Sequence, residues 1–320
     1  MEQQLKLHVY EKSLYGSSVV KLNKNPRALE FEKEKFIQSL QSFLEPLDFE
    51  ILQVRGRPKV DMKTVIASLL LMSFNGYSYQ RTQTDLKELT EKEVIRKVIP
   101  KSTLNDYAND ENVKNLLTKL IPLSAMFFND NENTLLLDST WLATRMYSGG
   151  YKIVHDKVHV NYGETRKLHV GCLKNSRVIC YAVTSAGNVN DSPVGREIIE
   201  KVSKAGFNIT KVLGDAGYLS KETYALCKEL GILDPYINFR KNCKIRNGGS
   251  DLWKDKLKMW KDTPQAWNES YRYRVLIEGV FSAMKRKQQN WLRSKTELAQ
   301  DIELLLKCLV YNLTIIGKYS

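Results

Sequence analysis

The stretch that decides the fold runs from Tyr271 to Lys287 and reads YRYRVLIEGVFSAMKRK. It contains one glycine and no proline, and its apolar residues recur at helical spacing, which predicts an amphipathic helix. Because successive helical residues turn by about 100°, four different side chains fall on nearly one line, namely those of Tyr271, Arg274, Glu278 and Lys285. The predicted helix therefore presents a phenol, a guanidinium, a carboxylate and an ammonium on one face.

This polar face has two interpretations. As an ordinary solvated surface, it gains about 0.2–0.5 kcal/mol from an ion pair between Arg274 and Glu278. The spacing also resembles the signature helix of DDE transposases of bacterial and archaeal insertion sequences, in which Tyr, Arg, Glu and Lys stand at these offsets. In that family the Glu is the third metal-binding carboxylate of an RNase H-like active site. The resemblance therefore implies two further carboxylates upstream, each at the end of an apolar strand.

Two aspartates stand at such places. Residues 134–137 form a short apolar run that leads into Asp138, and residues 209–214 form another that leads into Asp215. The carboxyl ends of strands are where α/β sheets bind ligands. Each aspartate by itself also suits a helix cap or a turn. The letters DST from Asp138 and DAGY from Asp215, however, resemble the first and second catalytic motifs of the same family, in the right order.

The resemblance makes Asp138, Asp215 and Glu278 both the catalytic residues and the metal ligands. DNA cleavage and strand transfer are in-line displacements, which two divalent ions about 3.5–4 Å apart can assist at the attacking and leaving oxygens. Mg²⁺ prefers oxygen ligands and keeps several waters, so a few carboxylates suffice. The expected cofactor is therefore a pair of Mg²⁺ ions, with Mn²⁺ as a substitute.

The resemblance also implies DNA contacts by other side chains. Arg274 suits a phosphate as a bidentate fork and Lys285 as a point charge, while Tyr271 either binds a phosphate or positions a carboxylate. His169 belongs to a Lys-x-His pattern that relatives also carry. It either helps to bind a phosphate or a metal-bound water, or it is buried with its hydrogen bonds satisfied.

A lysine-rich insert at about residues 240–268 carries Trp253, Trp260 and Trp267 at intervals of seven residues. One interpretation is a buried stripe of a helix. The other is that one tryptophan stacks on an unpaired or flipped base, for which we take Trp260 as the candidate. Related transposases carry such aromatics in this insert.

The order of elements predicts an α/β fold from about residue 130 onward. Strands and helices follow one another as strand, strand pair, helix, strand, helix, strand, with a helix at 191–204. Under the resemblance, residues 130–320 are a catalytic domain with an RNase H-like mixed sheet flanked by helices. The strongly apolar segment 301–316 is expected to form a helix that packs on this sheet.

Residues 1–125 are predicted to be an all-helical domain for DNA binding or dimerisation, after a loosely held arm over about 1–25. A helix is expected at 61–74, with Asp61 as its cap and Asn75-Gly76 as its stop, and Ser102 or Thr103 caps a later one. Arg57 lies in a basic Arg-Gly-Arg-Pro-Lys turn. The family associates this region with recognition of the element's terminal DNA, whereas a purely supporting bundle is the alternative.

The composition fits an intracellular DNA-binding protein. The chain has 320 residues, 42% of them hydrophobic, a formal charge of +13 and a pI near 9.3, which suits a polyanionic partner. Five cysteines without a CxxC pair indicate free thiols in a reducing compartment. The N-terminus lacks the apolar run of a signal peptide. We expect a cytoplasmic, nucleoid-associated protein without a membrane segment.

The sequence therefore predicts a DDE transposase that binds the terminal inverted repeats of an insertion sequence, cleaves them and joins 3′ ends to target DNA. Because two ends must be held together, a homodimer in a synaptic complex is expected. Three alternatives stay open. These are an RNase H-like nuclease without strand transfer, a catalytically silent relative that only binds DNA, and a basic structural protein.

Overall fold

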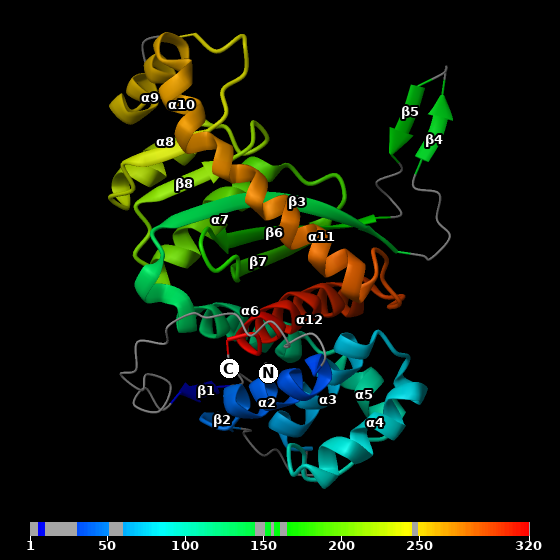
Figure 1. Cartoon of the computed structure of the whole chain (residues 1–320). Helices are drawn as coiled ribbons and strands as arrows, with labels where there is room; N and C mark the ends of the chain where they lie inside the picture. The colour runs from blue at the N-terminus through cyan, green and yellow to red at the C-terminus, as the bar shows by residue number, and fades with distance from the viewer. Residues whose placement is uncertain are drawn as a thin grey trace. The chain divides into compact units, whose positions relative to one another are not determined.

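The structure is a computed structural model of the whole chain, shown in Figure 1. It describes residues 6–9, 31–50, 60–144, 151–154, 157–160, 165–244 and 249–319. The chain divides into two compact units, which are described one at a time. The first comprises Met1–Phe127 with Arg286–Ser320, and the second comprises Phe128–Lys285.

The second unit is built on a five-stranded mixed sheet. In spatial order its strands are β7 (Ile179–Ala186), β6 (Thr165–Leu173), β3 (Thr134–Ala143), β8 (Lys211–Gly214) and β9 (Asp234–Ile237). The pairs β3–β6 and β6–β7 are antiparallel, whereas β3–β8 and β8–β9 are parallel. With the helices described below, this is the α/β, RNase H-like arrangement that the sequence predicts.

Strand β3 extends further than the sequence indicates. Its apolar run predicts an end at Asp138, but the strand continues to Ala143. The antiparallel neighbour β6 pairs with β3 from Leu135 to Ala143, whereas the parallel neighbour β8 pairs only from Thr134 to Leu137. Because pairing with β6 satisfies the backbone beyond the end of β8, Asp138 lies within a strand, where the parallel neighbour stops.

Helices α7 (Asp191–Lys204) and α8 (Lys221–Glu229) follow the strands in the predicted places. Helix α7 packs against β6 and β7. Helix α8 begins after Ser220, whose Oγ accepts a hydrogen bond from the Thr223 backbone N–H at 3.1 Å. Such a cap satisfies one of the amide groups that the first turn of a helix leaves without a partner.

The predicted insert is helical. Helices α9 (Asp251–Asp262) and α10 (Pro264–Tyr271) occupy it, and α10 contacts β9. A separate two-stranded sheet, β4 (Tyr151–Val154) with β5 (Lys157–Val160), lies between β3 and β6 in the sequence. This hairpin lies outside the elements that the sequence predicts.

The stretch from Tyr271 to Lys287 is not one continuous helix, which corrects the prediction. Helix α10 ends at Tyr271, the first residue of this stretch. The 3₁₀ segment η3 then covers Arg272–Val275, and α11 runs over Leu276–Gln288. Aromatic and β-branched residues in η3 lose side-chain freedom in an α-helix, which favours a break here. Figure 1 shows α11 passing across the sheet over β3. Arg274 nevertheless still contacts Glu278, one turn along.

The first unit is mainly helical. Its helices are α2 (Glu32–Leu44), α3 (Met62–Asn75), α4 (Tyr79–Glu91), α5 (Lys101–Tyr107), α6 (Glu111–Ala125) and α12 (Glu297–Ile316), and the 3₁₀ segment η1 (Met126–Asn131) follows α6. Two short strands, β1 (Lys6–Val9) and β2 (Leu47–Glu50), pair antiparallel. Part of the predicted loose arm is therefore a strand. The rest of residues 1–25, and Arg57, lie outside the described residues.

The caps of α3 are as predicted, and that of α5 is not. Asp61 Oδ2 accepts a hydrogen bond from the Thr64 backbone N–H at 3.2 Å, and Gly76 ends the helix with φ +62°. A glycine adopts this left-handed backbone without steric cost. Helix α5 starts instead after Pro100, without a side-chain cap, so Ser102 and its neighbour fall inside the first turn.

Helix α12 packs on α2, α3 and α6, all of the first unit, and its predicted packing on the sheet stays a prediction. It is apolar around most of its circumference, and such a helix is covered only when several neighbours surround it. Residues 286–320 therefore form one compact unit with the N-terminal helices, whereas the sequence grouped them with the sheet. No helix in the described ranges is long and apolar enough to span a membrane.

Candidate active site

Asp138 is nearly buried, with 9% of its surface exposed. Its Oδ1 accepts a hydrogen bond from the Ser139 backbone N–H at 2.9 Å, and its Oδ2 accepts one from Arg274 Nη2 at 3.1 Å. Burial raises the pKa of Asp138, the two donors lower it, and the negative charge of Asp215 raises it again. The two aspartates are therefore close enough to repel each other.

The sheet brings these two aspartates to one edge. Leu137 pairs with Gly214 across β3 and β8, so Asp138 and Asp215 are the next residues of two parallel neighbours. Asp215 Oδ1 accepts a hydrogen bond from the Gly217 backbone N–H at 2.8 Å. A Cβ at Gly217 would lie only 3.0 Å from that same oxygen, so glycine keeps the space beside the carboxylate open.

Glu278 reaches the same place from the first turn of α11. Its side chain is 55% exposed, and its Oε1 accepts a hydrogen bond from Arg274 Nη2 at 3.0 Å. The same nitrogen binds Asp138, so one guanidinium joins carboxylates that come from β3 and α11. Burial lowers the pKa of Arg274, but the surrounding negative charges, that of Asp138 foremost, raise it overall.

The pKa of Tyr271 depends on the charges of all three acidic residues. Burial raises the pKa of its phenol, Arg274 opposes this, and the charges of Asp215, Asp138 and Glu278 raise the pKa further. Since such interactions fade with distance, all three carboxylates lie near enough to Tyr271 to act on its phenol. Three acidic residues that are far apart in the sequence therefore influence one phenol in the second unit, and their role as a catalytic trio stays a prediction.

The donor set fits a hard divalent cation, because it consists of carboxylate oxygens. The guanidinium of Arg274 lies between two of these carboxylates and supplies positive charge that they need in a half-buried place. Within the part of the chain that the structure describes, no group of three or more His, Cys, Asp or Glu side chains is already spaced as a metal site.

His169 is fully buried, which corrects its predicted contact with DNA. Its Nε2 lies 3.0 Å from Ser185 Oγ, and its Nδ1 lies 3.2 Å from Asp191 Oδ1. The histidine is thus buried among polar groups, but its hydrogen bonds are not all satisfied as the other interpretation expects, because its Nδ1 makes no hydrogen bond among the described residues.

The three tryptophans of the insert have different surroundings. Trp253 and Trp267 are buried, with 7% and 1% of their surface exposed. They pack around Phe239, with ring centroids 5.0 Å and 5.6 Å from its own. Both are thus buried as that interpretation expects, but they come from two helices, α9 and α10, and not from a stripe of one helix. Trp260 is half-buried, and its ring centroid lies 5.8 Å from that of Phe239. Base stacking by Trp260 stays a prediction.

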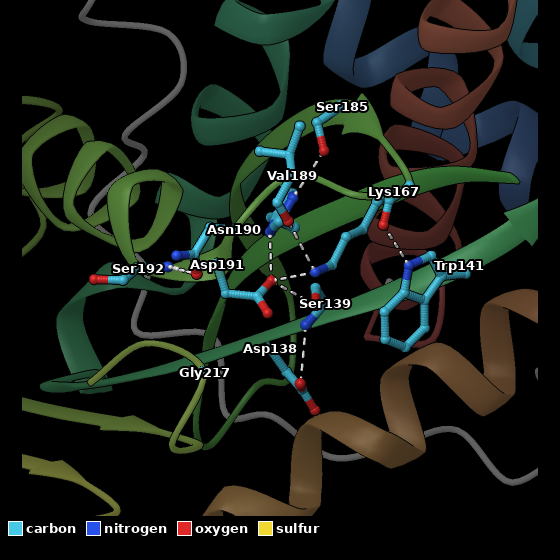
Figure 2. Close-up of polar contacts among 12 residues, drawn as sticks. Asp138, Ser139, Trp141, Lys167, Ser185, Val189, Asn190, Asp191, Ser192 and Gly217 are labelled. Carbon is cyan, nitrogen blue, oxygen red and sulfur yellow. Dashed lines mark hydrogen bonds and ion pairs between the residues drawn. The ribbon is translucent and has the colours of Figure 1, made fainter. Parts of the chain in front are cut away.

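A further acidic residue, Asp191 at the start of α7, was missed by the sequence analysis, which took it only for the start of a helix. Its Oδ1 accepts hydrogen bonds from Lys167 Nζ at 2.7 Å and from Ser139 Oγ at 3.0 Å, as Figure 2 shows. Asp191 Oδ2 lies 3.0 Å from the point that a Cβ on Gly217 would occupy. Asp191 thus ties α7 to the residue next to Asp138.

Lys167 is the positive partner in this network, with only 4% of its surface exposed. Its Nζ also donates a hydrogen bond to the Val189 carbonyl at 3.3 Å and lies 4.9 Å from the centroid of the Trp141 ring. Burying an ammonium is costly unless it is paired. An alternating strand pattern in the sequence cannot reveal that Lys167 and Asp191 are partners, because they come from different elements.

Two solved structures are similar in part to this chain. The Drosophila P element transposase in a strand transfer complex has 13% sequence identity, with 65% of this chain and 43% of that chain covered and a TM-score of 0.29. The piggyBac transposase in a synaptic complex with hairpin DNA, determined by cryo-EM, has 9% identity, with 99% and 77% covered and a TM-score of 0.41. The chain thus spans less than half the length of the P element protein. No curated protein matches the sequence.

The family comparison is more direct. Residues 130–313 match the family described as transposase DDE domain. The matched segment contains Asp138, Asp215 and Glu278 and covers more than half of the chain. By this match the protein belongs to the transposase DDE domain family.

Proposed function

We propose that this protein is the transposase of an insertion sequence, which binds the ends of the element, cleaves them and joins their 3′ ends to target DNA. The observation that carries the proposal is the convergence of Asp138, Asp215 and Glu278 around Arg274, within a chain of the transposase DDE domain family. Clustered carboxylates on neighbouring elements suit phosphodiester chemistry that uses divalent ions.

In this proposal Asp138, Asp215 and Glu278 hold two Mg²⁺ ions, for which Mn²⁺ substitutes. Bound there, the ions would neutralise charge on a phosphodiester and favour attack by a hydroxyl or a water. The protein's own groups align the DNA: Arg274 offers a planar fork to a phosphate, and the Tyr271 phenol donates a hydrogen bond beside it. Lys285, half-buried with its pKa lowered by burial, contributes a further cation along α11.

Arg274 has a second role in the protein without metal, where it compensates Asp138 and Glu278. An incoming ion must compete with this guanidinium for the same oxygens. We therefore expect Arg274→Gln to bind Mg²⁺ about tenfold more tightly, a gain of about 1.4 kcal/mol, while DNA cleavage becomes slower.

Calorimetric titration of the DNA-free protein with Mg²⁺ measures the affinity. Arg177→Gln, which removes an exposed guanidinium of the same unit, is the matched control and should leave the Mg²⁺ affinity unchanged. Equal or weaker Mg²⁺ binding by Arg274→Gln would show that the guanidinium does not compete with the ion.

Strand transfer is the decisive test of the function. The substrate is a plasmid that carries the genomic sequences flanking the coding region, incubated with the protein, Mg²⁺ and a second plasmid as target. A transposase gives ends cut at fixed positions and covalent joints between donor 3′ ends and target DNA. Cleavage without joints would identify a nuclease instead, and Mg²⁺-independent binding without cleavage would identify a silent DNA-binding relative.

A homodimer is part of the same proposal, because two ends must be cut and joined in one complex. Light scattering on the protein bound to an end-containing duplex should give the mass of two chains with two duplexes. One chain per duplex under conditions of active strand transfer would contradict it.

A further inference from the structure

A group of cations surrounds Tyr273, the residue before Arg274. Lys174 Nζ lies 4.1 Å from the centroid of the Tyr273 ring, and the Arg272 Cζ lies 5.0 Å from it. Arg272 Nη2 also donates a hydrogen bond to the Tyr273 hydroxyl at 3.1 Å. Cations are attracted to the face of an aromatic ring, so the ring holds two positive side chains near each other.

Lys211, at the start of β8, lies next to the same group, because it pairs with Thr134 across β8 and β3, and the Lys174 backbone N–H bonds to the carbonyl of Thr134. The pKa of Tyr273 is lowered by the hydrogen bond and charge of Arg272, and also by the charges of Lys174 and Lys211. Lys211 Nζ lies 5.3 Å from the centroid of the neighbouring Tyr236 ring. Three elements, the β6–β7 turn, the start of β8 and η3, therefore bring their cations to one place.

These three cations have no acidic partner among the described residues, since none of them lies within ion-pair distance of a carboxylate there. Lys256, beside them at Tyr236, differs because its Nζ binds Asp234 Oδ1 at 2.7 Å. The carboxylate of Glu132 is also committed, because it accepts the backbone N–H groups of Asn175 and Ser176 at 3.0 Å and 2.5 Å. The positive charge of Lys174, Lys211 and Arg272 is thus left for an external anion.

The group lies at a definite distance from the acidic site. The Lys174 backbone N–H bonds to the carbonyl of Thr134, the first residue of β3. Asp138 is four residues further along this strand, or about 13 Å at a rise of about 3.3 Å per residue. Duplex DNA carries a phosphate on each strand about every 3.4 Å along its axis, so this span corresponds to about four base pairs.

We propose that Lys174, Lys211 and Arg272 form a binding surface for the phosphate backbone of duplex DNA, about four base pairs from the bond held at Asp138, Asp215 and Glu278. The inference rests on the proposed function, since it takes DNA as the partner. Tyr273 orders the cations and is not a stacking platform for a base, because its ring already contacts two of them. A flexible, strongly hydrated lysine gains from such ordering, since less side-chain entropy is then lost on binding.

The test is the salt dependence of DNA binding without metal, so that catalysis plays no part. The probe is a fluorescein-labelled 20-base-pair duplex of arbitrary sequence in EDTA, titrated by fluorescence anisotropy between 50 and 200 mM NaCl. Each lost phosphate contact flattens the plot of log K against log[salt] by about 0.9. The triple variant Lys174→Ala/Lys211→Ala/Arg272→Ala should flatten the slope by about two to three and bind about a hundredfold more weakly at 100 mM.

The matched control removes the same charge elsewhere on the same unit, in Lys201→Ala/Lys204→Ala/Lys228→Ala. These lysines are exposed, and two of them are paired with Glu200 and Asp251. This variant should change the slope by less than about one, the contribution of a single phosphate contact. If the triple variant does not fold by circular dichroism, Lys174→Gln and Arg272→Gln serve singly, each with an expected change of about 0.9.

The outcomes separate the two proposals. If the unmodified protein and the triple variant show the same steep slope of log K against log[salt], the proposed binding surface is wrong, but DNA binding itself stands. Equal flattening by the triple variant and its control would mean that only net charge matters, and would also overturn it. An unmodified protein with no salt-dependent binding would remove DNA as the partner, and with it the proposed function.

Discussion

Asp138→Asn is expected to slow Mg²⁺-dependent cleavage of the end-containing plasmid by about a thousandfold or more. Asp138 is the most buried of the three acidic residues, and both Arg274 and Asp215 shift its pKa. An amide has one weak oxygen ligand and no charge, so the site would lose much of its attraction for divalent ions. A loss of about 4 kcal/mol of transition-state stabilisation, within the several that such ions supply, corresponds to about three powers of ten in rate.

The matched control for this variant is Asp130→Asn, an exposed aspartate of the same unit, which should cleave at the normal rate. Calorimetry provides a second readout, because Asp138→Asn should also bind Mg²⁺ more weakly while its thermal unfolding stays cooperative. Cleavage by Asp138→Asn at more than about a tenth of the normal rate, a cost of less than 1.4 kcal/mol, would end the assignment of Asp138 as a catalytic ligand.

Asp191→Ala is expected to lower the free energy of unfolding by about 3–5 kcal/mol, the cost of breaking a buried ion pair by removing one partner. The variant leaves the ammonium of Lys167 buried without its carboxylate partner. It also removes the oxygen that accepts the hydrogen bond of Ser139 Oγ. Since Ser139 follows Asp138, the loss also loosens the strand that carries the first of the proposed catalytic aspartates. Urea unfolding followed by circular dichroism measures the effect.

Two further variants separate the pair from the rest of the network. Asp191→Ala combined with Lys167→Met should recover most of the loss, because an apolar side chain of similar length replaces the unpaired charge. Asp251→Ala breaks a solvent-exposed contact with Lys228 at 3.4 Å and should cost less than about 1 kcal/mol. An Asp191→Ala protein as stable as Asp251→Ala would show that the buried pair contributes nothing.

The same pair predicts a pH dependence. Burial raises the pKa of Asp191, but its contacts with His169, Lys167 and Ser139 lower it to about 2, below the ordinary value of 3.8. A lowered pKa means that the stabilisation is complete above pH 3.8 and is lost as the pH falls towards about 2. The stability difference between the unmodified protein and Asp191→Ala should therefore shrink across this acid range.

The sequence predicted much of the fold because the relevant signals are local. Apolar runs ended near Asp138 and Asp215, and the cap at Asp61 and the glycine stop at Gly76 were readable from a few neighbouring residues. The spacing of Arg274 and Glu278 also held, since residues four apart remain neighbours even where a 3₁₀ segment replaces part of the helix.

Features that depend on which elements become neighbours were not readable in this way. A lysine within a strand looks solvent-exposed until another element supplies its partner, so the pairing of Lys167 with Asp191 and the burial of His169 appeared only in three dimensions. The same holds for α12. Its apolar surface predicts that other elements cover the helix, but it does not predict which elements these are.

The sequence by itself thus determined the order of strands and helices, because propensity and periodicity act over short distances. It also singled out three acidic residues as candidates through a family resemblance. The tertiary structure alone decided that one guanidinium nitrogen binds both Asp138 and Glu278, and that Lys174, Lys211 and Arg272 gather at Tyr273. Electrostatic interactions between side chains depend on separation in space, and the packing of the sheet and its helices sets that separation.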